Sequence, residues 1–397
     1  MPYTSGMTSS AVDKTKATRP PAPPLFPFLD LKAQFAPIRD EVMAAVVRVF
    51  ESQQFILGSE VKQFEDEVAA KLGAKHAIGC ASGTDALILA LMACEIGPGD
   101  EVITSPFSFV ATAGSIAQVG ARPVFVDIEP DTFNLDAKKL PAAITGRTTA
   151  ILPVHLFGLP ADLHAILATA KAHDLLVIED AAQAIGSRYN GQSVGTAGDV
   201  GCFSFFPSKN LGAAGDGGLV TASNAATSER LRMIRVHGSK QKYFHDLQGI
   251  NSRLDTLQAA VLRVKLQHLD RWAEGRTGRA DRYRRLFAEK GLGRFVSWPS
   301  VPPPAFHHVY NQFTIRAERR DELKAFLGSV GIPTEIYYPL CLHLQKAFAH
   351  LGYQAGDFPV AEKASTEVLA LPIFPELTDS QQDSVVQGIA EFYLTGK

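Results

Sequence analysis

The sequence predicts an α/β protein with a large domain, built on a seven-stranded, mostly parallel sheet between helices, and a smaller C-terminal α+β domain. Between residues 76 and 222, short apolar segments alternate with stretches of helical periodicity, which is typical of parallel strands covered on both faces. After Asn224 the pattern changes to long, charged helices. A chain of 397 residues, 46% of them hydrophobic, is long enough to form two cores.

Seven segments are predicted as strands of the large sheet. They are short and almost wholly apolar, and they cover residues 76–82, 101–105, 123–128, 148–157, 175–179, 200–206 and 218–222. Helices are predicted between them at 83–95, 109–119 and 161–172. Ligands bind beyond the carboxyl ends of strands in such sheets, so the polar residues after these strands are the candidates for a functional site.

Composition and periodicity divide the rest of the chain. Residues 1–24, rich in Ser, Thr, Lys and Pro, are predicted to be a disordered leader. Residues 25–252 form the predicted large, cofactor-binding domain. Residues 253–397 form the smaller domain, which begins with one long helix over 253–272 and a second, charged helix over 277–290.

Charge and hydropathy exclude several classes of partner. The formal net charge of −2 gives no electrostatic basis for binding nucleic acid or an anionic membrane. No apolar run reaches the length of a membrane span, and the first residues lack the apolar core of a signal peptide. The four cysteines lie far apart, without metal-ligand spacing. We therefore expect a cytoplasmic protein that holds no metal.

Lys209 is the candidate reactive group. It follows the apolar segment 203–206 and Pro207, and the glycine-rich run 212–218 comes soon after it. An amine on a desolvated apolar surface has a lowered pKa and can attack a carbonyl. A single lysine at a strand end can equally reach into solvent, so the prediction depends on its neighbours.

Other strand ends carry groups suited to a flat, phosphorylated ring. Gly83 and Thr84 open a predicted helix, where free amides bind phosphate, although a plain helix cap gives the same pattern. Asp180 follows an apolar strand, where a carboxylate can pair with a protonated ring nitrogen or only cap a turn. Gln183 can donate to a ring oxygen.

Two further side chains complete the set. Phe109 can stack on a ring or pack into the core, and Ser204, close to Lys209 in the chain, can add a phosphate contact. An anion cradle, a counter-acid, a stacking ring and an amine are together the parts needed to hold pyridoxal phosphate, a phosphorylated pyridine aldehyde.

With these residues the chain resembles the DegT/DnrJ/EryC1/StrS family of sugar aminotransferases, which have fold type I among pyridoxal-phosphate enzymes. The resemblance extends over everything after the leader and is highly specific around Lys209. It is carried by residues 28–32, 83–87, 99–102, 109–112, 153–155, 178–183, 203–218, 237–238, 251–255 and 371–372.

The resemblance implies a role for each candidate residue. Lys209 links covalently to the cofactor and later moves the proton between substrate carbon and cofactor. Asp180 binds the pyridine nitrogen, Gln183 binds the ring hydroxyl and Phe109 stacks. The phosphate is held by Gly83, Thr84 and Ser204.

The resemblance also implies the reaction and the assembly. L-Glutamate leaves its nitrogen on the cofactor, which becomes pyridoxamine phosphate, and a nucleotide-linked keto sugar then takes the amine. Asn251 matches an asparagine that reaches the phosphate of the other subunit's cofactor, so a homodimer with shared sites is implied.

The opening motif at 28–32 resembles members that act on 3-oxo sugars, either dTDP-linked 6-deoxyhexoses or UDP-linked hexuronates, in amino-sugar, polysaccharide or glycoside biosynthesis. A 4-oxo sugar is the alternative acceptor. Many relatives carry His-Tyr-Pro-x-Pro near the substrate, whereas residues 337–341 here read Tyr-Tyr-Pro-Leu-Cys. Candidate substrate contacts are Tyr310, Tyr338 and His343.

Three rival functions fit part of the pattern. Dehydratases of the same fold have a histidine in place of the lysine, so Lys209 argues against that activity. A nicotinamide-dependent dehydrogenase needs a helix after its glycine-rich turn, whereas an apolar strand follows 212–218. A non-catalytic, cofactor-binding sensor remains open, because a fold alone does not prove turnover.

Overall fold

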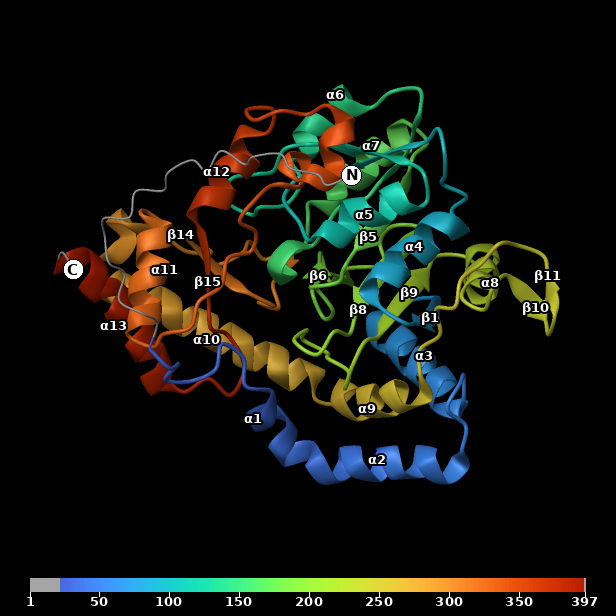
Figure 1. The fold of residues 1–397 in the computed structure, drawn as a ribbon, viewed down its shortest axis with the longest axis horizontal. Helices are drawn as coiled ribbons and strands as arrows, with labels where there is room; N and C mark the ends of the chain where they lie inside the picture. Colours follow the sequence, from blue (N-terminus) through green and yellow to red (C-terminus); the bar gives the residue numbers. More distant parts are fainter. Residues whose placement is uncertain (1–21, 396–397) are drawn as a thin grey trace, which may run out of the picture.

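The computed structural model describes residues 22–395 and contains one large sheet with helices, followed by a smaller C-terminal part (Figure 1). Residues 1–21 of the predicted leader lie outside the described residues. Ala22, near the leader's end, donates to the Gly328 carbonyl at 3.0 Å. Within residues 22–395, no helix is long and apolar enough to cross a membrane.

The large sheet has the strand order β1-β9-β8-β5-β4-β2-β3. Its strands are β1 His76–Cys80, β2 Glu101–Thr104, β3 Arg122–Phe125, β4 Thr148–Ile151, β5 Leu176–Asp180, β8 Val200–Ser204 and β9 Gly218–Ala222. The strands from β8 to β3 pair in parallel, while β9 is antiparallel to both β8 and β1. The prediction of a seven-stranded, mostly parallel sheet is confirmed. The predicted strand 148–157 was too long, because Pro153 has no N–H to donate to a neighbouring strand.

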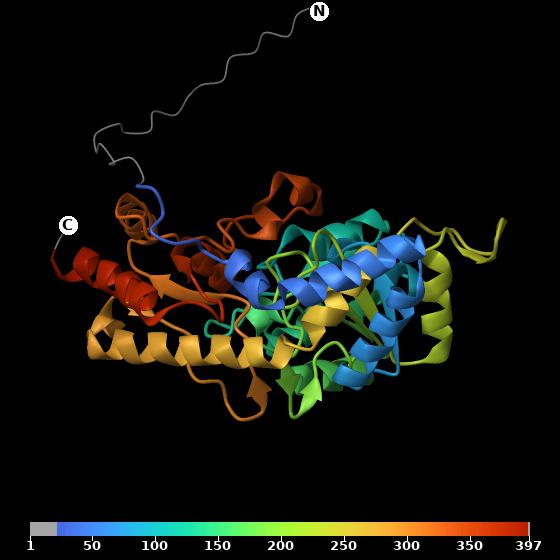
Figure 2. The same ribbon diagram turned by 90° about the horizontal axis from the view of Figure 1, so that it is seen from below.

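Helices cover both faces of this sheet (Figures 1 and 2). One face packs against α4 (Gly83–Ala93), α5 (Val110–Gln118) and α8 (Ala225–Ile234). The other packs against α3 (Ser59–Leu72), α7 (Leu163–Ala172) and α9 (Thr256–Leu266). Successive residues of a strand point to opposite faces, so Cys202 joins the first core and Phe203 the second.

The predicted helices 253–272 and 277–290 were wrong in their bounds. The first ends earlier, as α9, and α10 extends over Leu269–Glu289. Between them the amides of Gln267 and His268 donate to carbonyls three residues earlier, at 3.3 and 3.0 Å. This tighter hydrogen bonding makes one turn that separates the helices. Figure 1 shows α10 running from the end of α9 into the C-terminal part.

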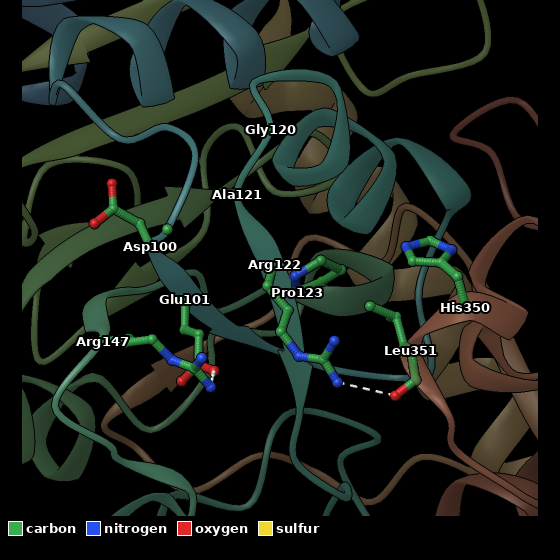
Figure 3. A pocket seen from close by; sticks show the side chains of 10 residues that line it. Asp100, Glu101, Gly120, Ala121, Arg122, Pro123, Arg147, His350 and Leu351 are labelled. Carbon is green, nitrogen blue, oxygen red and sulfur yellow. Dashed lines mark hydrogen bonds and ion pairs between the residues drawn. The ribbon is translucent and has the colours of Figure 1, made fainter.

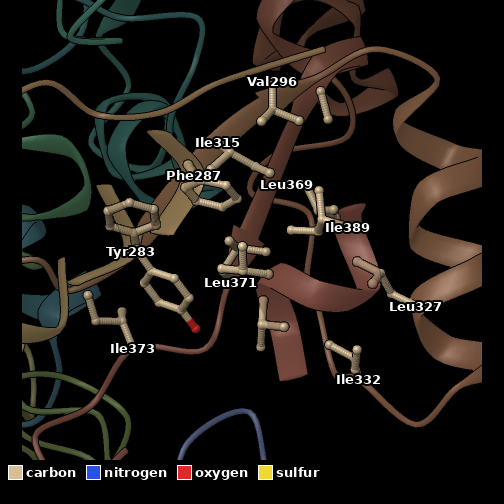
Figure 4. Packing of buried hydrophobic residues seen from close by; sticks show 14 of the residues in the cluster. Tyr283, Phe287, Val296, Ile315, Leu327, Ile332, Leu369, Leu371, Ile373 and Ile389 are labelled. Atoms are coloured by element: carbon tan, nitrogen blue, oxygen red, sulfur yellow. The ribbon is translucent and has the colours of Figure 1, made fainter. Parts of the chain in front are cut away.

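The C-terminal part is built on the sheet β12-β14-β15. Its elements are β12 Val296–Ser297, β14 Phe313–Ala317, α11 Arg320–Ser329, α12 Pro359–Glu367, β15 Val368–Leu371 and α13 Asp379–Leu394. Side chains from α10, α11, α13 and this sheet form its core (Figure 4). Phe26 packs into the same core from the N-terminal segment. The domain bounds 25–252 and 253–397 stay a prediction.

The remaining elements are short or lie at the surface. They are α1 Leu31–Phe35, α2 Arg39–Ser52, α6 Leu140–Ala143, β6 Arg188–Tyr189, β7 Gln192–Ser193, β10 Ser239–Gln241, β11 Phe244–His245 and β13 Phe306–His307. The hairpin β10–β11 projects from the body of the protein (Figures 1 and 2).

Candidate active site

The carboxyl ends of β5 and β8 adjoin, because these strands pair in parallel with Asp180 opposite Cys202. Asp180 is the last residue of β5. After β8 ends at Ser204, the chain makes a turn in which the Lys209 amide donates to the Phe206 carbonyl at 2.8 Å. The turn brings Lys209 back to the strand ends, where its charge interacts with that of Asp180.

Burial changes the acidity of the Lys209 amine. It lowers the Lys209 pKa from 10.5 to about 8, and the Asp180 carboxylate opposes part of that fall. Near neutral pH the folded protein therefore contains a fraction of neutral amine, which is the form that reacts with a carbonyl.

The Asp180 carboxylate is buried and held by short polar contacts. Thr112 Oγ1 donates to Oδ2 at 2.8 Å, and the Ala182 amide donates to Oδ1 at 3.1 Å. Burial raises the pKa of Asp180, while these donors and Lys209 oppose the rise. Two carboxylate oxygens accept about four hydrogen bonds, so Asp180 retains capacity for a further N–H donor.

The role of Thr112 was missed at the sequence level. Its hydroxyl lies 2.9 Å from the hydroxyl of Ser108, four residues earlier, and both are buried beside Asp180. The spacing of two hydroxyls by one helical turn was a usable signal, but their contact with Asp180 follows only from strand order.

Glu179 is held on the face of the sheet opposite to Asp180. As the neighbour of Asp180 in β5 it points to the opposite face, where it accepts a hydrogen bond from His155 Nε2 at 2.9 Å. His155 Nδ1 accepts from the Ala161 amide at 3.0 Å, so the ring proton lies on Nε2. Burial acts to raise the Glu179 pKa, but the hydrogen bond from His155 and those from backbone amides outweigh it and lower that pKa. The amides belong to Gly195, Ala197 and Gly198.

Three predicted residues gather beside Asp180. Gln183 Nε2 donates to the Tyr338 hydroxyl at 3.0 Å, and Gln183 Oε1 accepts from the Phe157 amide at 2.6 Å. The Tyr338 ring lies 6.4 Å from the ring of Phe109, which is 55% exposed. Gln183 retains one amide N–H for a ring oxygen, and Phe109 has an open side on which a ring can stack.

The predicted phosphate-binding residues also lie together. Gly83 opens α4, whose N-cap Ser82 accepts from the Asp85 amide at 3.0 Å. A Cβ atom on Gly83 would lie 2.6 Å from Ser204 Cβ, so only glycine permits this approach of helix and strand. The first turn of α4, with Thr84, offers backbone amides that have no partner within the helix.

Other predicted site residues lie outside this cluster. Tyr310 is 1% exposed within the C-terminal core, and its hydroxyl accepts from Arg284 at 3.0 Å. His343 is buried with its Nε2 3.0 Å from Glu362. Asn251 is exposed and bridges to Val236. Their roles stay predictions.

A separate pocket of about 270 Å³ lies at the opposite, amino-terminal ends of β2 and β3 (Figure 3). Its arginines already have partners: Arg147 pairs with Glu101 at 2.6 Å, and Arg122 donates to the Leu351 carbonyl at 2.9 Å. None of the predicted site residues lines this pocket, and we assign no function to it.

Comparison with known proteins decides the family. Residues 37–390 match the model of the DegT/DnrJ/EryC1/StrS aminotransferase family. The chain belongs to this family. The predicted family, fold type and aminotransferase class are therefore confirmed, and so is pyridoxal phosphate as the cofactor on which the family depends.

Relatives in the DegT/DnrJ/EryC1/StrS family are similar over almost their whole length. The chain is 55% identical to a pleiotropic regulatory protein of Geobacillus stearothermophilus, over 92% of this chain and 98% of the relative. It is 51% identical to a UDP-N-acetyl-3-dehydro-α-D-glucosamine 3-aminotransferase of Acidithiobacillus ferrooxidans, over 89% and 94%. The crystal structure of Streptomyces venezuelae DesV with a ketimine intermediate superposes with a TM-score of 0.89 at 45% identity, covering 93% of this chain and 98% of DesV.

The residues at the strand ends fit pyridoxal phosphate. Asp180 can accept a ring N–H, Lys209 can supply an amine, and the closely spaced Gly83 and Ser204 leave backbone amides for a phosphate. The charges match as well, because a cationic ring nitrogen would face a buried carboxylate.

Replacing Lys209 tests whether its burial has the expected energetic cost. The Lys209 amine loses its proton near pH 10.5 in the unfolded chain but near pH 8 in the folded protein. Folding therefore pays the full free-energy cost of desolvating the charged amine below pH 8, and none of it above pH 10.5. We expect Lys209→Met to raise the free energy of unfolding of the cofactor-free protein at pH 7 by about 1–3 kcal/mol, with no gain near pH 10.5. Urea unfolding at both pH values measures the difference.

The matched control is Lys62→Met, because Lys62 is exposed and pairs with Asp66 one helical turn away. It should change the free energy of unfolding by less than about 0.5 kcal/mol at either pH. A Lys209→Met gain that is equal at both pH values would show that the effect comes from packing and not from a buried charge.

Proposed function

We propose that this chain transfers an amino group from L-glutamate to C3 of a nucleotide-linked 3-oxo sugar, with pyridoxal phosphate as cofactor. The observation that carries the chemistry is the partly buried amine of Lys209, whose pKa desolvation lowers to about 8 although the Asp180 carboxylate opposes the fall. The choice of C3 and of a UDP-linked sugar is supported by the 51% identity to the Acidithiobacillus 3-aminotransferase. A dTDP-linked 3-oxo sugar is the next acceptor to test, and a 4-oxo sugar the third.

Asp180 and its neighbours set the charge at the site. When bound, pyridoxal phosphate supplies an electron sink that lets an amino group leave one carbon skeleton and join another. Asp180 would accept the ring N–H and keep that nitrogen cationic, and Thr112, which donates to Oδ2, would orient the carboxylate for this contact. Gln183, which donates to the Tyr338 hydroxyl, would donate its remaining N–H to the ring hydroxyl.

Lys209 acts on protons at the substrate carbon. Its neutral amine takes the proton from the carbon that bears the donor nitrogen and returns a proton to the acceptor carbon in the second half of the cycle. A pKa of about 8 keeps both forms of the amine populated near neutral pH, so one group serves as base and acid. The amides that open α4, with Ser204, would hold the phosphate and so fix the position of the ring.

We further propose a homodimer whose two sites are shared. Apolar side chains are exposed beside the site, including Val110 and Phe206 at 46% and 53%. A further apolar stripe, formed by Met43, Val47 and Phe50, is exposed on α2. Exposed apolar patches of this kind mark interfaces, and a second copy of the chain is the partner that the resemblance implies. Asn251, exposed in one copy, would complete the partner's site.

A cofactor-binding regulator is the second candidate. It is favoured by the 55% identity to the pleiotropic regulatory protein of Geobacillus. Such a protein would keep Lys209 and Asp180 to hold the cofactor but would not turn over.

The absorbance of the reconstituted protein separates these candidates. We expect bound pyridoxal phosphate to give a visible band that L-glutamate bleaches, with release of one 2-oxoglutarate per site, and that a UDP-linked 3-oxo sugar restores. dTDP-linked 3-oxo sugars and 4-oxo sugars of both nucleotides complete the panel. Lys209→Ala is the matched control and should show no bleaching.

Each outcome identifies one candidate. Restoration by only a 4-oxo sugar would contradict amination at C3. A stable band that glutamate and the other common amino acids leave unchanged would contradict the aminotransferase and favour the regulator.

Mixing two inactive variants tests the shared site. In a homodimer, Lys209→Ala and Asn251→Ala subunits combine so that one of the two sites has both residues. With half of the dimers mixed after equal exchange, activity at limiting cofactor should recover to about a quarter of wild type. Sedimentation confirms the dimer, and absence of recovery despite exchange would show that each site is built within one subunit.

A further inference from the structure

Helix α9 holds the loop that follows Lys209 through two side chains. Gln258 Oε1 accepts a hydrogen bond from the Ala214 amide at 2.8 Å, and Lys265 Nζ donates to the Gly212 carbonyl. These two side chains are seven residues apart, about two helical turns, so they project from the same side of α9. The helix is itself fixed between α2 and the large sheet (Figure 1).

The burial of Lys265 costs folding free energy. It is 9% exposed, and within residues 22–395 no carboxylate lies within ion-pair distance of its amine. Besides the Gly212 carbonyl, the Trp272 ring faces the amine, with its centroid 5.8 Å from Nζ. An apolar side chain would avoid the cost of burying a cation, and the hydrogen bond from the Lys265 amine to the Gly212 carbonyl offsets part of that cost.

The loop that α9 holds, residues 207–214, contains Lys209 and is closely packed. A Cβ on Gly212 would lie 2.2 Å from the Pro207 carbonyl oxygen, so the two ends of the loop are in contact. The Ala213 amide donates to the Phe205 carbonyl at 2.8 Å, and Asn210 Nδ2 donates to the Val309 carbonyl at 3.0 Å. Because the loop is packed this closely, a displacement of Gly212 also displaces Lys209.

We propose that Lys265, assisted by Gln258, is a positioning residue that fixes the loop 207–214 and so keeps the Lys209 amine desolvated opposite Asp180. The effect of this positioning on catalysis rests on the proposed function. The hydrogen bonds that fix the loop do not depend on that function. We predict that removing the hydrogen bonds from α9 to the loop raises the pKa of Lys209 toward that of an exposed lysine.

The test measures Lys209 reactivity in the cofactor-free protein. Brief exposure to cyanate across a range of pH, followed by peptide mass spectrometry, gives the pH midpoint of Lys209 carbamylation. We expect a midpoint near pH 8 for wild type and a rise of about one unit or more in Lys265→Met, because solvent then reaches the Lys209 amine.

The control is Arg263→Met on the same helix. Arg263 pairs with Glu60 and Glu67 of α3 and has no bond to the loop, so its loss lowers stability without moving the Lys209 midpoint by more than about 0.2 units. Comparing Lys265→Met with Arg263→Met therefore distinguishes a change in the position of the loop from a general loss of stability in α9.

A second pair of variants decides the matter if Lys265→Met does not fold. Gln258→Leu removes the acceptor for the Ala214 amide and should raise the midpoint, whereas Gln258→Glu keeps an acceptor and should leave it near that of wild type. Unchanged midpoints in both Lys265→Met and Gln258→Leu would overturn the proposal. Failure of the wild-type protein to take up pyridoxal phosphate would instead contradict the proposed function, while the cyanate midpoints would still report on the loop.

Discussion

A partly buried lysine amine that interacts electrostatically with the buried Asp180 carboxylate, at the ends of β5 and β8, is the constraint on which this structure depends. Lowering the Lys209 pKa from 10.5 to about 8 corresponds to a cost on the order of 3 kcal/mol at neutral pH, which the surrounding scaffold must offset. The scaffold does so from several sides. Thr112 orients the Asp180 carboxylate, and the Glu179–His155 pair anchors the end of β5 from beneath. The contacts of α9 with the glycine-rich loop fix the turn that carries the lysine.

Much of this arrangement could be predicted from sequence, for identifiable reasons. The apolar strands, the chain turn after Phe206 and the polar residues at strand ends are local signals, and they place Lys209, Asp180 and Gly83 at one edge of the sheet. Contacts across long sequence separations could not be predicted. Thr112 meets Asp180 across 68 residues, and this depends on which strands are neighbours. The break between α9 and α10 was missed because helical periodicity continues through it.

Family membership settles the enzyme class and the cofactor, while finer properties need their own measurements. The exact sugar depends on side chains that contact the acceptor, and Tyr310 and His343 are enclosed in this structure. The cytoplasmic location, the domain bounds and the roles of individual site residues stay predictions. The Lys209 amine and the Asp180 carboxylate would serve a regulator as well as a transaminase, so the family assignment and not this pair carries the enzyme class.

The most direct measurement is to identify which lysine holds the cofactor. The protein is saturated with pyridoxal phosphate, reduced with borohydride and digested, and the modified peptide is sequenced by mass spectrometry. The account predicts a single modified residue, Lys209. Lys265 is the informative competitor, since burial lowers its pKa to about 8 as well. Modification of Lys265 in place of Lys209, or no reducible linkage at all, would contradict the assignment of the amine on which the site is built.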